Sequence, residues 1–73
     1  MKMKKGDVVE CVDAKGSEYL TNGKSYEVVA GKGDNGIFAY ISNDIGFEIV
    51  DDDGEVIFQY GLDGYHGLFE VQK

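Results

Sequence analysis

Short runs of β-branched, aliphatic and aromatic residues, separated by glycines and by Asn and Asp, make up most of this sequence. Within several of these runs apolar and polar positions alternate, which is typical of strands. No window of about a dozen residues shows a helical period, so no long helix is expected. The runs predict strands at residues 7–12, 24–30, 37–42, 45–50, 55–60 and 68–71.

Turn signals stand between these predicted strands. Asn22–Gly23 precedes the second strand, and a glycine-rich stretch at residues 31–36 precedes the third. The run of three aspartates at 51–53, followed by Gly54, is the clearest hairpin turn. Five or six short strands of this kind predict an all-β fold, a small and strongly bent antiparallel barrel, because curling a short sheet removes its exposed edges.

The aromatic residues divide into two groups according to these strands. Those in phase with apolar neighbours are expected in the core, namely Tyr26, Phe38, Phe47, Phe58 and Phe69. Tyr19 and Tyr65 fall in predicted loops. Loop tyrosines serve either as plugs onto the core or as interface anchors, because they bury a large area at low entropic cost.

The length and composition define a single domain. We assign residues 6–73 to the barrel and residues 1–5 to a basic tail, which is expected to be flexible or to become ordered on a partner. The single cysteine, Cys11, allows no internal disulfide. No apolar run approaches the ~18 residues of a membrane span. These features predict a cytoplasmic protein that does not contact a membrane.

The charge distribution is strongly uneven. The chain has seven lysines, no arginine and fourteen acidic residues. Residues 6–72 hold three of the lysines and all fourteen acids, a net charge of −11. Phosphate backbones repel such a surface, so direct binding of nucleic acid is not expected. The acidity favours either a basic partner or simple solubility.

The residues that could carry catalysis or hold a metal are few. Cys11 and His66 are the single cysteine and the single histidine, which is too few for structural zinc in a monomer. We expect Cys11 to be a small buried apolar residue and His66 to lie in a surface turn. The acids at 51–55 are consecutive and flanked by hairpin strands, unlike a helix–loop–helix calcium site. The glycines at 31–36 lack the lysine and serine of a phosphate-binding loop. The sequence therefore predicts no enzyme, metal or cofactor.

Four segments carry a resemblance to known proteins. Residues 5–13 (KGDVVECVD), 20–28 (LTNGKSYEV), 47–55 (FEIVDDDGE) and 67–71 (GLFEV) follow one another in the order and spacing of an SH3-like barrel. In this arrangement the chain resembles small SH3-like proteins encoded in bacteriophage genomes, most of which have no known role. The segment at 31–44 is longer than this pattern. The opening KGDVV also resembles the first strand of KOW-type barrels in transcription elongation factors.

These resemblances imply a phage-encoded accessory protein that binds a host protein in the bacterial cytoplasm and changes its activity. RNA polymerase or an associated factor is the first target expected, with inhibition or antitermination as the effect. We expect a monomer or a weak homo-oligomer. The candidate partner-binding residues are the loop tyrosines, the acids of the central hairpin and the basic tail: Tyr19, Tyr65, Glu48, Asp51, Asp52, Asp53, Glu55, Lys2, Lys4 and Lys5.

Two other functions remain open. Acids spread over a small barrel could imitate a nucleic-acid backbone and inhibit a host defence or DNA-binding enzyme, provided that they follow phosphate spacing. A small-molecule sponge would need a pocket between protomers. The absence of arginine argues against a phosphate ligand, because arginine is favoured for bidentate contacts to phosphate.

Overall fold

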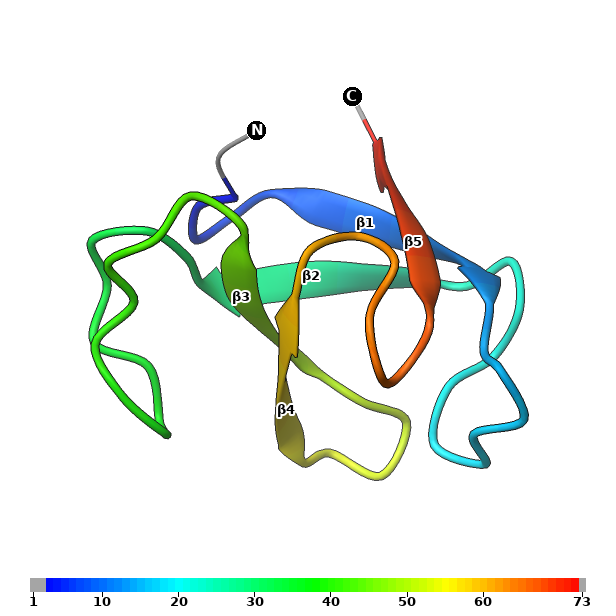
Figure 1. Ribbon diagram of the computed structural model, residues 1–73. Coiled ribbons are helices and arrows are strands. Elements are labelled where there is room, and N and C mark those ends of the chain that lie inside the picture. Colours follow the sequence, from blue (N-terminus) through cyan, green and yellow to red (C-terminus); the bar gives the residue numbers. More distant parts are fainter. Residues whose placement is uncertain (1–2, 73) are drawn as a thin grey trace.

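A computed structural model describes residues 3–72. Within them it has no helix, and hence none that could cross a bilayer, and it has five strands. The strands are β1 (Val8–Asp13), β2 (Ser25–Ala30), β3 (Gly46–Val50), β4 (Val56–Tyr60) and β5 (Leu68–Gln72). They form one antiparallel sheet in the order β4-β3-β2-β1-β5, which curls into a half-barrel (Figure 1). The predicted small, strongly bent, antiparallel all-β fold is confirmed, with five strands.

The strand predicted at residues 37–42 is wrong. Residues 31–45 instead form a long loop, drawn in green in Figure 1. The loop bonds to itself: Gly36 N donates to Ala39 O at 2.9 Å, and Ile41 N donates to Asp34 O at 3.0 Å. Ile41 is buried, whereas Ile37 is 71% exposed. The apolar run at 37–42 therefore contains one buried side chain, Ile41, and several exposed ones. The sequence pattern alone does not distinguish this arrangement from a strand.

The core lies inside the curl of the sheet. Val9, Val28 and Ile49 are fully buried there. Phe69 packs edge-on against both Tyr26 and Phe47, with ring centroids 6.3 and 6.1 Å apart. Such edge-to-face pairs satisfy the aromatic quadrupoles and contribute about 0.5–1.5 kcal/mol each beyond the area they bury. The prediction that Tyr26, Phe47 and Phe69 are core residues is confirmed.

Two other phenylalanines predicted in the core lie elsewhere. Phe38 is 64% exposed on the 31–45 loop, and Phe58 is only half-buried. On β4 the inward side chains are Ile57 and Gln59, so the strand presents the opposite phase to the sheet interior. The alternation of apolar residues predicted the wrong core face for β4, because the face that packs inward contains a buried glutamine.

The packed part of the chain begins before β1. Met3 is 2% exposed and belongs to the core, and its carbonyl accepts a hydrogen bond from Lys32 N at 3.1 Å. Gly31 passes so close that a Cβ there would lie 2.0 Å from the same carbonyl oxygen. Met3, which we had assigned to the basic tail, thus packs with the barrel and holds the start of the 31–45 loop.

Candidate functional site

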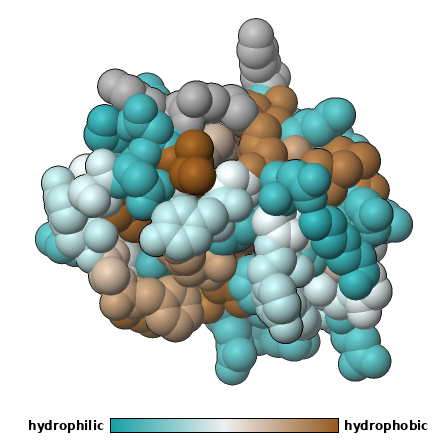
Figure 2. All heavy atoms as spheres, viewed as in Figure 1, coloured by the Kyte–Doolittle hydropathy of each residue, from teal (hydrophilic) through white to brown (hydrophobic). Residues whose placement is uncertain are grey.

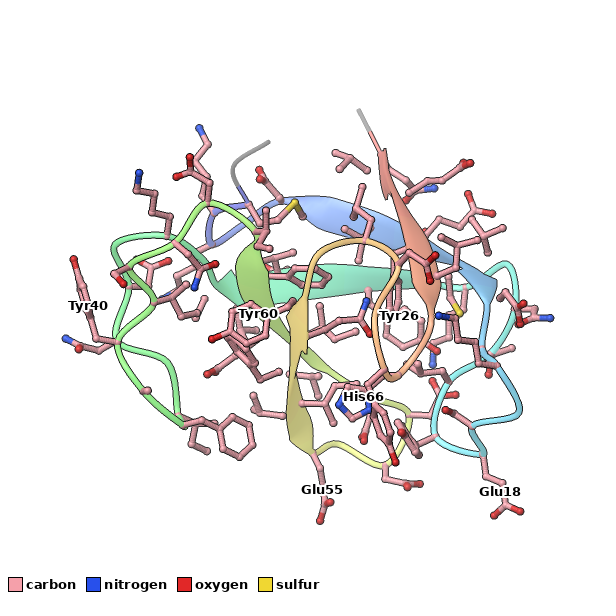
Figure 3. All side chains as sticks on the ribbon, in the orientation of Figure 1. Glu18, Tyr26, Tyr40, Glu55, Tyr60 and His66 are labelled. Carbon is pink, nitrogen blue, oxygen red and sulfur yellow. The ribbon has the colours of Figure 1, made fainter. Side chains whose placement is uncertain are left out.

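Exposed aromatic side chains gather along one side of β4. Phe38 and Tyr40 from the 31–45 loop and Phe58 and Tyr60 from β4 line a shallow hollow of about 140 Å³. Tyr40 and Tyr60 are each about 60% exposed, and the rings of Phe58 and Tyr60 meet edge-on at 4.8 Å. We call these four residues the aromatic groove. Tyr40 and Tyr60 are labelled in Figure 3, and Figure 2 shows apolar side chains over the lower left of the same face.

The aromatic groove continues past the start of β4. Phe38, Ile57, Phe58 and His66 line a second, more open hollow of about 390 Å³. The His66 ring lies edge-on between those of Tyr19 and Tyr65, at centroid distances of 5.6 and 5.2 Å. Tyr65 is 88% exposed at this end. A row of aromatic rings thus extends from the 31–45 loop to the loop at residues 61–67.

Glu48 holds the 31–45 loop in place. Its side chain is buried on the face of β3 opposite the core, at 1% exposure, and its carboxylate accepts hydrogen bonds from Ile37 N at 2.9 Å and Phe38 N at 3.3 Å. A Cβ at Gly36 would lie 2.0 Å from Glu48 Oε2, so only glycine allows this approach. Glu48, a predicted partner-binding residue, lies instead beneath the loop and positions Phe38.

Gln59 holds the 61–67 loop in a similar way. Its Oε1 accepts hydrogen bonds from His66 N at 3.0 Å and Gly67 N at 3.1 Å. Its Nε2 donates to the carbonyls of Gly61 and Gly67 at 2.9 and 3.0 Å. A Cβ at Gly64 would lie 2.3 Å from Gln59 Cγ. This bonding satisfies a buried amide and fixes the loop that carries Tyr65 and His66.

The predicted acidic turn is largely occupied by its own contacts. Asp51 is 9% exposed, and its Oδ1 accepts hydrogen bonds from Asp53 N and Glu55 N, both at 2.9 Å. Asp52 accepts hydrogen bonds from Thr21 Oγ1 at 2.7 Å, Lys24 Nζ at 2.6 Å and Tyr26 Oη at 2.9 Å. Asp52 therefore ties the turn to the start of β2.

These contacts change the protonation equilibria around Asp52. The bonds from Lys24 and Thr21 lower the pKa of Asp52 to about 2, since they stabilise the carboxylate. The bond to Asp52 also raises the pKa of Lys24 above its ordinary value. Asp52 is thus charged at neutral pH and acts as a structural ion.

The remaining predicted residues are more accessible. Asp53, Glu55, Lys4 and Lys5 are exposed, whereas Lys2 lies outside the described residues. Tyr19 is half-buried, and its hydroxyl is hydrogen-bonded to His66 Nδ1 at 2.7 Å. The structure brings Tyr19 and Tyr65 together around His66. Lys4 lies elsewhere, just before β1, where its backbone N donates to Asp7 Oδ2 at 3.0 Å.

Sequence reasoning missed the aromatic groove. Phe38 and Phe58 were expected in the core, and Tyr40 and Tyr60 were not singled out. One signal for the outward phase of β4 was available in Gln59, since a buried amide can replace an apolar residue wherever backbone groups of a nearby loop satisfy it. That loop comes after β4 in the chain, so the signal required the tertiary structure.

Cys11 and His66, the side chains that could support catalysis, make no hydrogen bond to each other. Cys11 is fully buried, and burial, together with nearby Asp13 and Asp52, raises the pKa of its thiol. Its thiolate is therefore disfavoured, in contrast to a reactive cysteine. His66 bonds to Tyr19 instead. Across residues 3–72 no group of three or more His, Cys, Asp or Glu side chains is arranged to hold a metal ion.

The chain matches no protein-family model, and neither a curated protein nor a solved structure matches it. The fold and the surface thus define the class: a small all-β half-barrel that displays an aromatic groove between two loops, each held by a buried polar side chain.

Proposed function

We propose that this chain is a non-enzymatic protein-binding module whose docking surface is the aromatic groove. The gathering of Phe38, Tyr40, Phe58 and Tyr60, from two separate segments, in one exposed hollow carries this proposal. Exposed aromatic patches of this kind are typical of interaction sites. Rigid Tyr and Phe side chains contribute strongly to interfaces because they bury much area and lose few rotamers.

The charge of the domain supports a basic partner. Lys15, Lys24 and Lys32 form ion pairs with Asp63, Asp52 and Asp44, so their charges are locally compensated. The excess of acids remains, with Asp53 and Glu55 exposed just before β4. An acidic body attracts a basic surface from a distance, which raises the association rate and selects among partners.

The bacteriophage and KOW-type resemblances direct the choice of target. We propose a phage-encoded accessory protein that acts in the host bacterial cytoplasm on RNA polymerase or an associated factor. RNA polymerase presents broad basic surfaces, which suit an acidic module with an aromatic anchor. The effect would be inhibition of transcription or antitermination. The burial of Cys11 and the bonding of His66 to Tyr19 fit a binding role.

The test is a binding measurement with purified bacterial RNA polymerase, as core enzyme and as holoenzyme. The wild-type chain is compared with Phe38→Ser/Tyr60→Ser, which removes two anchors without touching the core. We expect this variant to lose about 30- to 100-fold in affinity, the size typical of interface hot spots. The matched control is Val12→Ser/Val50→Ser, which removes two exposed apolar residues that line neither hollow.

We expect the control pair to bind within about threefold of wild type. Thermal unfolding of all three proteins, followed by circular dichroism, checks that each is folded. Equal losses in the two double variants, or none in either, would contradict the aromatic groove as the docking surface. Absence of polymerase binding by the folded wild type would remove this target.

The acid excess favours a second candidate, a nucleic-acid mimic that inhibits a host defence or DNA-binding enzyme. Burial of Glu48 and Asp51, and the ion pair of Asp52, withdraw part of that charge from the surface. A mimic would be displaced from its target by DNA and would bind with a steep salt dependence. A small-molecule sponge is the third candidate, to be tested only if no macromolecule binds.

A further inference from the structure

The two edge strands of the sheet are treated differently. The outer edge of β5 is partly covered by the 61–67 loop, because Phe69 N donates to Leu62 O at 2.8 Å and Leu68 forms a bridge with Asp63. β4 pairs with β3 on one side, and no other segment of residues 3–72 pairs with its outer edge. An uncovered edge strand is a template for pairing with another chain.

The register identifies the backbone groups at this open edge. Asp51 N donates to Glu55 O and Gly61 N donates to Ile45 O, at the two ends of β4. Bonded and non-bonded pairs alternate along an antiparallel ladder. The backbone groups of Ile57 and Gln59 therefore point to β3, whereas those of Val56, Phe58 and Tyr60 point away from it.

The usual protections of an edge strand are missing from β4. Its sequence, Val-Ile-Phe-Gln-Tyr, contains no charged residue and no proline, and its pairing with β3 runs through all five residues without a bulge. Natural proteins normally protect edges with such features. An edge without them, beside exposed aromatic side chains, is open to pairing with another strand.

The larger hollow reaches this edge. It is lined by Ile57 and Phe58, which are neighbours in β4 and point to opposite faces of the sheet. A hollow that contacts both therefore lies at the edge of the strand, and β3 occupies the other edge. Phe38 and His66 also line it, so the open space beside β4 is bordered by aromatic side chains from both loops.

We propose that the open edge of β4 binds an extended, basic segment of the partner as a sixth strand, with alternate apolar side chains of that segment in the aromatic groove. This mode of binding rests on the proposed function and specifies its partner. Backbone hydrogen bonds would supply affinity and the aromatic groove would supply selectivity, as in other cases of strand addition. Glu55, exposed at the start of β4, would attract a lysine or arginine of the segment.

Charge argues for a basic partner over a second copy. No lysine lines either hollow beside β4. Two copies joined edge to edge would bring together two chains that each carry a net charge of −7. Like charges placed together across an interface disfavour association, whereas a basic segment would be attracted.

The probe is a synthetic peptide of about six residues, the usual length of a strand, with blocked ends and alternating lysine and valine. The protein is ¹⁵N-labelled, and hydrogen exchange of its amides is followed by NMR with and without the peptide. We expect exchange at the Phe58 and Tyr60 amides to slow by about tenfold at saturation, while the Asp53 amide, which is bonded to Asp51 Oδ1 within the turn, does not change. A peptide with glutamate in place of lysine should bind at least about tenfold more weakly.

Peptides N-methylated at alternate residues, made in both registers, test the backbone bonds directly. In one of the two registers, methylation should weaken binding by about tenfold, because it blocks the edge that faces β4. Equal affinity of both methylated peptides and the parent peptide would overturn strand addition. So would unchanged exchange at Phe58 and Tyr60, even if RNA polymerase still required the aromatic groove. A concentration-dependent dimer that protects the same amides would overturn the basic partner in favour of self-pairing.

The two proposals fail separately. Peptide binding with protection of Phe58 and Tyr60, but no affinity for RNA polymerase, would support strand addition and remove only the proposed target. Polymerase binding that Phe38→Ser/Tyr60→Ser abolishes, without those protections, would support the docking surface and remove only strand addition.

Discussion

The acidic turn at 51–55 and two residues of the aromatic groove, Phe58 and Tyr60, belong to the same hairpin, but the turn and the groove use their side chains in different ways. In the turn, the carboxylates of Asp51 and Asp52 accept hydrogen bonds from the chain itself. In the groove, the rings of Tyr40 and Tyr60 remain about 60% exposed. The first two aspartates of the turn, which looked available in the sequence, are occupied, whereas Phe38, which was expected in the core, is at the surface.

This difference follows from what each side chain can satisfy locally. A carboxylate in a tight turn finds backbone N–H donors within a few residues, so its oxygens already accept hydrogen bonds in the folded chain. An aromatic ring on the outer face of an edge strand finds no such partner, and only another surface can bury it. Charge in a sequence is therefore a weaker indication of a contact than an aromatic residue whose neighbours in the fold leave it exposed.

The largest expected effect comes from the support beneath the groove. Glu48→Leu would leave the part-buried N–H groups of Ile37 and Phe38 without acceptors, which should cost about 1–3 kcal/mol of stability and release the loop. Urea unfolding measures the first effect, and affinity for the partner measures the second. Glu48→Gln is the control, since it keeps one acceptor oxygen and should lose less of both. Equal behaviour of the two variants would show that the loop does not depend on this carboxylate.

The support beneath the 61–67 loop should have the next largest effect. Gln59→Leu removes the partners of His66 N and Gly67 N, and we expect a loss of about 1–3 kcal/mol. Faster hydrogen exchange at the His66 and Gly67 amides would locate the change. Gln72→Leu is the control and should stay within about 0.5 kcal/mol, because the bonds of Gln72 to Ser25 and Glu10 are exposed to solvent. Unchanged exchange at both amides would refute the role of Gln59.

Asp52 should have a smaller, pH-dependent effect on stability. Its pKa is lowered from 3.8 to about 2 in the folded chain, so its contacts stabilise the fold above about pH 4. This contribution is lost as the pH falls through about 2, because the carboxyl becomes protonated. Thermal unfolding of wild type and Asp52→Asn should differ at neutral pH and converge in acid. A difference that stays constant down to pH 2 would exclude this carboxylate as its source.

The exposed acids of the turn should matter least. Asp53→Asn/Glu55→Gln should lower the association rate with a basic partner by about two- to threefold at low salt, and by less at high salt, because screening weakens exposed charges. Stopped-flow or sensor kinetics at two ionic strengths measures this. A loss as large as that of Phe38→Ser/Tyr60→Ser would reverse the comparison and make the acidic turn the main contact.

Local patterns were sufficient for most of the fold. The bounds of β1, β2, β3, β4 and β5 were each predicted to within one residue, because alternation and glycine turns are local signals. The hairpin between β3 and β4 was predicted for the same reason. The strand predicted at 37–42 was wrong, because an apolar run forms a strand only when another strand pairs with it. That pairing depends on residues far away in the sequence.

The sequence by itself determined that this protein is a short, acidic, glycine-punctuated β domain with one cysteine and one histidine. Only the tertiary structure decided which residues form its surface. Glu48 and Gln59 are buried because the loops at residues 31–45 and 61–67 supply hydrogen bonds that satisfy them. With Gln59 on the core face of β4, Phe58 and Tyr60 lie on the opposite face, and the bonds of Glu48 hold Phe38 in the same groove. A buried polar group needs partners in three dimensions, and no period along the chain specifies them.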